Sequence, residues 1–381
     1  MRTFRFRVYP TPQQEVLMSQ TIETCRRTYN QLLDDKIKNG TSYFDQRRLL
    51  GLRRPQDKFL KQVHSQVLQD VSLRLERASR AFLKGLSDFP KFKRNGRYNS
   101  FTYPQLGGFA LVGGRLRLSM IGRLRIRLHR DLVGRMKTCT VVRRIDQWYA
   151  CIVADIRVGG PPQHCGVPVG VDLGITSVVA LSDCRKVAAP RFLNKAEDEI
   201  RALQKSMSRK KSGSNNREKA RLKLAKAWRR LGNRRDDFAH KTSHFLAENY
   251  NQIVFEDLSI PRMVKNHKLA SAILDACWGK LRLLTASKAE SRSGRVILVD
   301  ARGTSQKCSR CGNAREMPLT ERIFRCEECG LELDRDVNAA RNILARGLEQ
   351  ARVEAGQIPT IRVSKSGRGS KKFRSILNSS R

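Results

Sequence analysis

Residues 307–343, KCSRCGNAREMPLTERIFRCEECGLELDRDVNAARNI, hold the pattern around which the rest of the chain is organised. Two Cys-x-x-Cys pairs, Cys308/Cys311 and Cys326/Cys329, are separated by fourteen residues. Four thiolates at this spacing can close a tetrahedral zinc site made of two short knuckles. Such a site is structural, because four cysteines leave no coordination position open. The alternatives are four ordinary buried cysteines or two disulfides, and the paired spacing favours zinc over both.

The chain carries a large excess of positive charge. Its 381 residues include 76 Lys and Arg against 35 Asp and Glu, a formal net charge of +41. A chain this basic needs a polyanion to neutralise it, and nucleic acid is favoured over an anionic membrane. The length predicts two or three domains.

The sequence predicts a cytoplasmic protein. No apolar run is long enough to span a bilayer and no stretch near Met1 resembles a signal peptide, so no membrane partner is expected. The cysteines outside the two pairs follow no pairing logic, as expected of reduced thiols. They are Cys25, Cys139, Cys151, Cys165, Cys184 and Cys277.

The N-terminal part predicts strands interrupted by helices. Residues 3–9 alternate apolar and basic side chains, which is typical of a strand that must pair with others. Residues 11–14, TPQQ, predict the capped start of a helix that Gly40 ends, and helical patterning resumes over 57–86. A small barrel or curled sheet that takes in residues 3–9 would make these helices an insertion. The later strands are predicted at 116–118, 123–128, 137–144 and 148–158, before a linker at 159–162.

Two basic segments suit contacts with nucleic acid. Residues 89–103, FPKFKRNGRYNSFTY, interleave cations for phosphates with rings for base stacking, although an irregular loop anchored by its aromatic residues fits equally well. Residues 209–235 carry twelve Lys and Arg against one acid, Glu218. This arm can track a phosphate backbone, and the alternative is a charged, exposed helix pair.

The C-terminal half predicts a mixed α/β domain. The predicted elements are a strand, a turn at Gly174 and a second strand over 167–182, helices over 194–249 broken near 212–216, a strand at 253–255, a helix over 268–293, a strand at 296–299 and a helix after Asp336. The residues after Glu354 include seven Lys and Arg and no acid, so they are expected to be disordered or to order on nucleic acid.

Three acids, Asp172, Glu256 and Asp336, each follow a predicted buried strand or begin a helix, and such positions converge at one edge of an α/β sheet. Carboxylates held close repel one another unless divalent cations lie between them, and hard oxygens favour Mg²⁺ or Mn²⁺ over zinc. Two such ions can activate a water and stabilise the departing oxygen of a phosphodiester, without a His or Ser nucleophile. The residues alone do not distinguish Asp336 from Asp334, or Glu256 from Asp257.

Four motifs resemble those of the TnpB family, nucleases encoded by bacterial and archaeal insertion sequences and related to the type V CRISPR effectors. They are GVDLGITS at 170–177, FEDLSI at 255–260, TSQKCSRCG at 304–312 and DRDVNAARNI at 334–343. The stretches FRFRVYPTPQQ and FPKFKRNGRYNSFTYP are also similar to that family, so the resemblance covers nearly the whole chain.

The resemblance implies an α/β domain together with a β-barrel and a helical lobe. The α/β domain would be an RNase H-like RuvC nuclease with a zinc-finger insert, and the N-terminal part a wedge barrel with an inserted recognition lobe. By position, Asp172, Glu256 and Asp336 are implied to be the catalytic, Mg²⁺-binding acids, and the four paired cysteines the zinc ligands. The expected bounds are 1–10 and 100–160 for the wedge barrel, 11–99 for the lobe, 161–303 and 332–347 for RuvC, 304–331 for the zinc finger and 348–381 for a basic tail.

The implied activity is RNA-guided cleavage of double-stranded DNA next to a transposon-adjacent motif, with a guide RNA transcribed from the element's own end. The chain is expected to act as a monomer in the prokaryotic cytoplasm, at the nucleoid when bound to DNA. The rival functions are a nuclease-independent guided regulator of transposition, a DNA transposase that joins strands itself, and a CRISPR-associated effector. Loss of cleavage in Asp172→Ala with retained guided binding would favour the nuclease, and strand transfer without RNA the transposase.

Overall fold

A computed structural model describes residues 1–156, 166–318 and 321–356 and forms two compact units, Met1–Gly160 and Pro161–Arg381. The linker predicted at 159–162 lies outside the described residues. Within the described ranges, no helix is both long enough and apolar enough to cross a membrane.

The first unit is built on a seven-stranded antiparallel sheet. Its strands are β1 (Arg2–Tyr9), β2 (Ser100–Tyr103), β3 (Phe109–Val112), β4 (Arg115–Leu118), β5 (Gly122–Arg127), β6 (Arg135–Arg144) and β7 (Gln147–Asp155), in the order β2-β6-β7-β1-β5-β4-β3. The N-terminal strand lies between β7 and β5, which confirms that it joins the later strands. Its alternation explains this place, because Phe4, Phe6 and Val8 are buried while the residues between them face outward.

The sheet curls without closing. Its ladder ends at β2 and β3, and no backbone pairing within the described part of the chain joins these two edges. Instead the Tyr103 hydroxyl of β2 donates to the carbonyl oxygen of Ser119, in the turn after β4, over 2.7 Å. The expected barrel is therefore an open half-barrel, held by a side chain where the ladder stops.

Helices are inserted between β1 and β2, and they are α1 (Pro12–Asn39), α2 (Tyr43–Arg53), α3 (Lys58–Lys61) and α4 (Ser65–Leu83). The predicted capping box begins α1, where Thr11 and Gln14 exchange hydrogen bonds between side chain and backbone. Gly40 ends this helix in the left-handed conformation, with φ 62°. The helix expected over 57–86 is divided, because His64 has the extended backbone of an N-cap. Helix α2 has no counterpart among the predicted elements.

The second unit contains a five-stranded mixed sheet. Its strands are β8 (Val167–Asp172), β9 (Ser177–Leu181), β10 (Lys186–Ala188), β11 (Tyr250–Glu256) and β12 (Arg295–Val299), in the order β10-β9-β8-β11-β12. β11 is parallel to both of its neighbours, whereas β9 is antiparallel to both of its own. The strands predicted at 167–182, 253–255 and 296–299 are confirmed.

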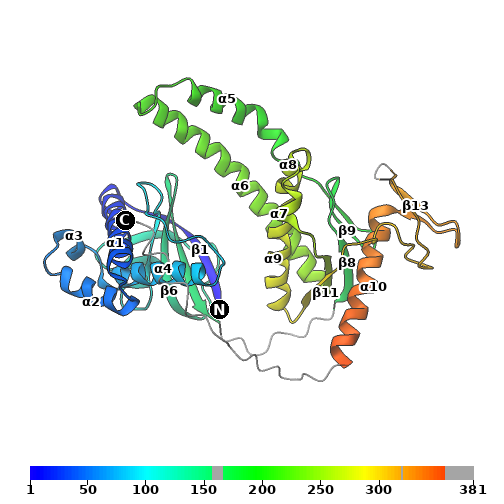
Figure 1. Cartoon of the computed structure of the whole chain (residues 1–381), viewed down its shortest axis with the longest axis horizontal. Helices are drawn as coiled ribbons and strands as arrows, with labels where there is room; N and C mark the ends of the chain where they lie inside the picture. The colour runs from blue at the N-terminus through cyan, green and yellow to red at the C-terminus, as the bar shows by residue number, and fades with distance from the viewer. Residues whose placement is uncertain (157–165, 319–320, 357–381) are drawn as a thin grey trace. The chain divides into compact units, whose positions relative to one another are not determined.

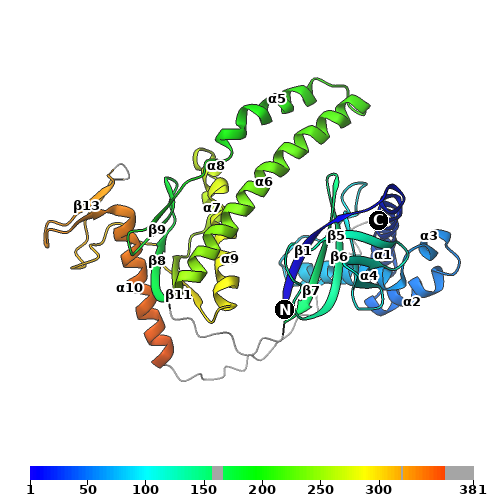
Figure 2. The same cartoon turned by 180° about the vertical axis from the view of Figure 1, so that it is seen from behind.

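Helices cover both faces of this sheet. α6 (Asn215–Asn249) and α9 (Trp278–Glu290) lie on one face and α10 (Arg335–Gly356) on the other (Figure 1, Figure 2). β11 serves both sides, because Ile253 and Phe255 join the core under α6 and α9, whereas Val254 packs with Ile343 of α10. The smaller elements are η1 (Asn194–Ala196), α5 (Glu197–Ser208), α7 (Ile260–Met263), α8 (His267–Ala276), β13 (Ile323–Arg325) and β14 (Glu332–Asp334).

Two predicted boundaries are wrong. The helix expected over 268–293 is two helices, α8 and α9, which meet at Cys277 in the left-handed conformation with φ 56°. Helix α10 continues to Gly356, so residues 348–356 are helical and do not belong to the tail expected over 348–381. Residues 357–381 lie outside the described residues.

Helix α10 approaches the sheet so closely that two positions require glycine. A Cβ atom on Gly170 of β8 would lie 1.9 Å from the carbonyl oxygen of Ala340 in α10. A Cβ atom on Gly347 of α10 would lie 2.4 Å from a methyl carbon of Val254. Packed backbone atoms cannot move far enough to remove so close a contact, so any side chain at Gly170 would force the helix away from the strand.

Gly170→Ala is therefore expected to destabilise the second unit by about 3 kcal/mol, because the added methyl group meets backbone rather than a flexible side chain. Calorimetry of the full chain should show the transition of this unit at a temperature lower by about 6 °C or more. Gly232→Ala in α6 is the matched control, since its Cβ atom would meet nothing within 4 Å, and it should melt at the wild-type temperature or above it. Unchanged melting of Gly170→Ala would contradict the close contact.

Candidate functional site

Two acids end neighbouring strands of the second unit. Asp172 is the last residue of β8 and Glu256 the last residue of β11, and these two strands are parallel and paired. Because the carboxyl ends of parallel strands meet at one edge of a sheet, both carboxyl groups lie at that edge. Asp336 lies in the first turn of α10, and the contact of this helix with Gly170 brings it to the same place.

Burial and mutual repulsion perturb these acids. Burial raises the pKa of Asp172 most, and the carboxylates of Glu256 and Asp336 raise it further, to about 8, against the opposing charge of Arg335. Burial also raises the pKa of Glu256, which is only 6% exposed, while the hydroxyl of Thr304 opposes the rise. Acids far apart in the sequence therefore act on one another across a shared site.

The neighbouring acids, which sequence patterns do not separate from these three, have other contacts. Asp257 is exposed, and its carboxylate accepts a hydrogen bond from Arg282 at 3.1 Å. Asp334 caps α10 by accepting from the backbone N–H groups of Asp336 and Val337 at 3.0 and 3.2 Å. Asp334 also forms an ion pair with Lys186 of β10 at 2.6 Å. The geometry therefore favours Glu256 over Asp257 and Asp336 over Asp334 as members of the site.

The three carboxylates are neighbours rather than a closed ligand set. Among the described residues, the cysteine cluster is the group of three or more potential ligands whose donor atoms all lie within 4.8 Å of one another. The oxygens of Asp172, Glu256 and Asp336 are more widely spread. Like charges repel, so carboxylates converge further only with cations between them, and their hard oxygens fit Mg²⁺ or Mn²⁺.

The four paired cysteines meet in the second unit as the sequence predicts. The Sγ atoms of Cys308, Cys311, Cys326 and Cys329 all lie within 4.8 Å of one another. Two sulfur pairs, Cys308 with Cys329 and Cys311 with Cys326, are 3.6 and 3.5 Å apart. A disulfide needs about 2.05 Å, so the disulfide alternative is not adopted. The cluster can hold a metal ion, and four sulfur donors fit zinc.

The two cysteine knuckles have the same backbone design. The N–H group of Gly312 donates to the carbonyl of Cys308, and that of Gly330 to the carbonyl of Cys326, each over 3.0 Å. Both glycines have left-handed backbone, with φ 83° and 67°. Burial would raise the pKa of Cys308, but hydrogen bonds from backbone N–H groups, that of Cys311 first, lower this pKa to about 6. Metals bind the thiolate, and these N–H groups favour the thiolate form of Cys308.

One residue in contact with the acids is missed by the sequence predictions. The Thr304 hydroxyl oxygen lies 2.5 Å from Oε1 of Glu256, and Thr304 is buried. It stands in the TSQKCSRCG stretch, in which only the cysteines indicate chemistry. A threonine hydroxyl is too common in loops to be singled out without a partner, and its partner is 48 residues away.

The aromatic residues of the segment at 89–103 differ in exposure, since those at 89 and 92 are exposed and those at 98–103 are buried. Its buried aromatic residues are Tyr98, Phe101 and Tyr103. Phe89 and Phe92 are 41% and 52% exposed. Arg26 and Asn30 of α1 hold the backbone carbonyl of Lys93 at 2.9 and 3.1 Å. The rings at 98–103 therefore belong to the core. Phe89 and Phe92 present their rings to solvent from a backbone that is anchored to α1 at Lys93.

The predicted basic arm is a helical hairpin of α5 and α6 that projects beyond the sheet of its own unit (Figure 1). Ile200, Ala227 and Leu231 form a small core inside it. Between residues 201 and 234 its exposed cations are Arg201, Lys205, Arg209, Lys211, Lys219, Arg221, Lys223, Arg230 and Arg234. The arm thus presents charge along much of its length, as a surface that follows a phosphate backbone requires.

The outer face of the first unit's sheet carries arginines directly opposite arginines. These cross-strand pairs, the arginine face, are Arg7 with Arg127, Arg115 with Arg125 and Arg117 with Arg123. Like charges opposite one another destabilise a sheet. No carboxylate in the described part of the chain forms an ion pair with these six residues. Arg7 stacks on Tyr9 and Tyr149, with 5.3 and 5.4 Å to the ring centroids. Cations beside rings and free of acids suit a nucleic acid.

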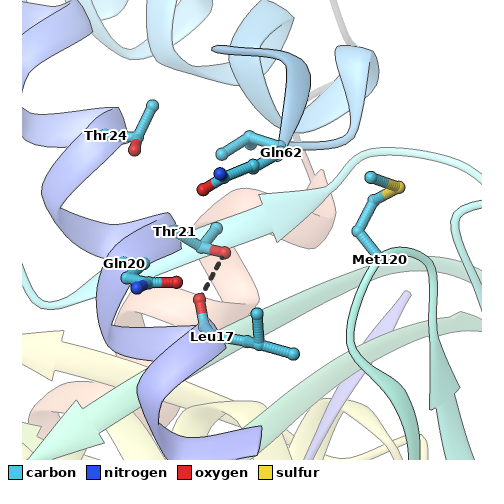
Figure 3. Close-up of a pocket in the computed structure, with 7 residues that line it drawn as sticks. Leu17, Gln20, Thr21, Thr24, Gln62 and Met120 are labelled. Carbon is cyan, nitrogen blue, oxygen red and sulfur yellow. Dashed lines mark hydrogen bonds between the residues drawn. The ribbon is translucent and has the colours of Figure 1, made fainter. Parts of the chain in front are cut away.

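A cleft in the first unit is too small for a substrate (Figure 3). Its space of about 10 Å³ is comparable with one water molecule. The hydroxyl of Thr21 donates to the backbone carbonyl of Leu17 over 2.8 Å, within the same turn of α1 (Figure 3). The cleft is lined by Leu17, Gln20, Thr21, Thr24, Gln62, Val63 and Met120. The perturbed acids of the second unit, rather than this cleft, are thus the candidate for chemistry.

Three family models match parts of the chain. Residues 139–267 match a family described as "Probable transposase", OrfB_IS605. Residues 278–343 match "Cas12f1-like, TNB domain". Residues 1–40 match a "Helix-turn-helix domain" of the OrfB_IS605 group, although in this chain they form one strand and one helix.

Curated relatives match over almost the full length. A "Putative RNA-guided DNA endonuclease" of Streptomyces pristinaespiralis is 34% identical over 387 residues, which cover 97% of this chain and 95% of the relative. A "Putative RNA-guided DNA endonuclease InsQ" of Escherichia coli (strain K12) is 31% identical over 371 residues, with 91% and 92% covered. The solved mini-RNA-guided endonuclease CRISPR-Cas_phi3 is 10% identical, with 91% of this chain and 92% of that chain covered and a TM-score of 0.44.

Asp172→Asn is expected to remove part of the pH dependence of stability. Folding raises the pKa of Asp172 from 3.8 to about 8, so between these values the folded chain holds a proton that the unfolded chain has lost. Stability without metal therefore decreases as the pH rises through this window. Melting in a chelator from about pH 5 to about pH 9 should fall less steeply for the variant, which should be the more stable form at the upper end. Equal slopes for wild type and variant would contradict the raised pKa of Asp172, and exposed Asp257→Asn is the control.

Proposed function

This chain belongs to the TnpB family of RNA-guided DNA endonucleases, and on that premise we propose that it cuts DNA at sites chosen by a guide RNA. The observation that carries the proposal is the convergence of Asp172, Glu256 and Asp336 at one sheet edge, two at the ends of paired parallel strands and one in the first turn of α10. The net charge of +41 supports polyanionic partners.

The proposal includes the biological setting that the family implies. The chain would be encoded by an insertion sequence, would take its guide RNA from the element's end, and would act on double-stranded DNA beside a transposon-adjacent motif. It would work as a monomer in the prokaryotic cytoplasm, at the nucleoid when bound to DNA.

The proposed chemistry is hydrolysis of a phosphodiester. Asp172, Glu256 and Asp336 would hold Mg²⁺ or Mn²⁺, which when bound supplies an activated water and neutralises charge at the scissile phosphate. Asp172 must lose its proton to become a ligand, so its raised pKa makes protons compete with the metal below about pH 8.

We assign the domains as the resemblance implies, with the corrected end of α10. The strand order β10-β9-β8-β11-β12 and the length of α10 support an RNase H-like RuvC domain made of 161–303 and 332–356. The cysteine cluster supports a structural zinc finger over 304–331. The half-barrel sheet of 1–10 and 100–160 would be the wedge, and the helices of 11–99 the recognition lobe.

Asp172→Ala, Glu256→Gln and Asp336→Ala are each expected to lower the rate of guided DNA cleavage by at least about a thousandfold, because each removes a metal ligand that the remaining chain does not replace. Guide RNA binding should stay at the wild-type level. The measurement is cleavage of a labelled duplex by the full chain with its guide RNA, in Mg²⁺.

Asp257→Asn is the matched control, because this acid follows Glu256 directly but contacts Arg282 and is not one of the proposed metal ligands. It should cut at close to the wild-type rate. Full cleavage by the Asp172→Ala chain would overturn the assignment of the site. A wild-type chain that binds guide and target without cutting would favour the regulator, and strand joining without RNA would favour the transposase.

We further assign the arginine face to the nucleic acid of the complex, with guide RNA as the partner to be tested. Three cross-strand arginine pairs impose repulsion on the folded sheet. Phosphates bound across them would convert this repulsion into attraction, and Tyr9, which lies opposite Arg125, offers a ring beside them.

Replacing Arg125 and Arg127 together by Ala is expected to weaken guide RNA binding by about tenfold and to reduce the salt dependence of log K by about 1.5, because two phosphate contacts are lost. The control pair is Lys38→Ala with Arg80→Ala, whose charges are already paired with Asp34 and Glu76. Filter binding over a series of salt concentrations makes the comparison. Equal losses in the two double variants would assign the effect to net charge and not to the arginine face.

A further inference from the structure

The buried hydroxyl of Thr304 is directed at the site. Its oxygen lies 2.5 Å from Oε1 of Glu256 and 3.1 Å from the backbone carbonyl of Ala301. A hydroxyl has one proton, and the closer, charged carboxylate is the stronger acceptor. Thr304 is 3% exposed, so water does not replace this hydrogen bond readily. The contact therefore selects one orientation of the Glu256 carboxylate.

Two asparagines of α10 hold the backbone around Thr304. The Asn342 side-chain amide donates to the carbonyl of Thr304 at 2.8 Å and to that of Lys307 at 2.6 Å. One helical turn earlier, the Asn338 amide donates to the carbonyl of Lys307 at 2.8 Å, and its side-chain oxygen accepts from the N–H group of Ser309 at 3.0 Å. Both asparagines are buried, and their polar groups are costly to leave without these partners.

These contacts join three parts of the second unit through one helix. Asp336 lies two residues before Asn338 on α10, and Cys308 follows Lys307 directly. The helix that brings Asp336 to the sheet edge therefore also fixes the segment that leads into the first cysteine knuckle. Through the Thr304 hydroxyl the same segment contacts Glu256 at the end of β11.

We propose that Thr304 is a positioning residue for Glu256, held in register by Asn338 and Asn342, so that the cysteine module and the acidic site form one mechanical unit. The inference rests on the proposed nuclease function and adds to it a residue outside the metal ligands. Outer-shell partners of this kind orient a ligand and contribute to metal affinity without touching the metal.

The test compares Thr304→Val with Thr304→Ser in the full chain bound to guide RNA and target duplex. Valine keeps the shape and removes the donor, so the Mn²⁺ concentration for half-maximal cleavage should rise by about 10- to 100-fold. The rate at saturating Mn²⁺ should fall much less, because the ligands themselves remain. Serine keeps the donor and should restore the half-saturation to within about threefold of the wild type. Calorimetric titration of the complex with Mn²⁺ alone, on an uncleavable target, gives the affinity without reference to cutting.

Thr285→Val is the matched control, because the Thr285 hydroxyl is also buried but donates to the carbonyl of Leu281 in its own helix, at 2.8 Å. It should leave Mn²⁺ half-saturation unchanged. Wild-type half-saturation in Thr304→Val would overturn the proposal. The proposal would also be overturned if Thr304→Val and Thr304→Ser both lowered the melting temperature or both lost bound zinc, because Thr304 would then have only a structural role. Absence of Mn²⁺-dependent cutting in the wild type would instead refute the proposed function.

Discussion

The backbone contact between α10 and β8 is the constraint on which the second unit depends. With no side chain at Gly170, the helix lies directly against the strand whose last residue is Asp172. This approach determines where the first turn of α10 lies, and therefore where Asp336 meets the strand ends. The acids come from three separate segments: the pairing of β8 with β11 places Asp172 beside Glu256, and the contact of α10 with Gly170 places Asp336 near them. Changes at Gly170 would act on the site at a distance through the position of the helix.

Helix α10 also holds the cysteine module that follows β12 in the chain. Its N-cap, Asp334, ends the small hairpin of β13 and β14, and its asparagines hold the segment before Cys308. A module of this size has little core of its own, here Cys308, Met317, Phe324, Cys326 and Leu331. It gains order from the helix, and a metal ion held by the four cysteines would add to that order. The site and the module thus share one rigid support, although their own chemistry is unrelated.

Local signals in the sequence predict much of this structure. Thr11 and Gln14 indicate the start of α1 because a capping box is a contact between near neighbours, and the cysteine spacing indicates the cluster for the same reason. The acids at strand ends are indicated by topology, but the choice between Glu256 and Asp257 needs the Arg282 contact, which is made across 25 residues. The break at Cys277, the length of α10 and the role of Thr304 depend on tertiary contacts. They leave no periodic or compositional pattern in the sequence.

The arginine face of the first unit has a consequence for the lifetime of the protein in a cell. An isolated copy contains charge repulsion between β1, β5 and β4 that no carboxylate of the described residues neutralises. If nucleic acid neutralises this face, the free chain opens more readily than the complex and meets proteases more often. The amount of protein would then follow the amount of guide RNA available to bind it, and copies without RNA would be degraded first.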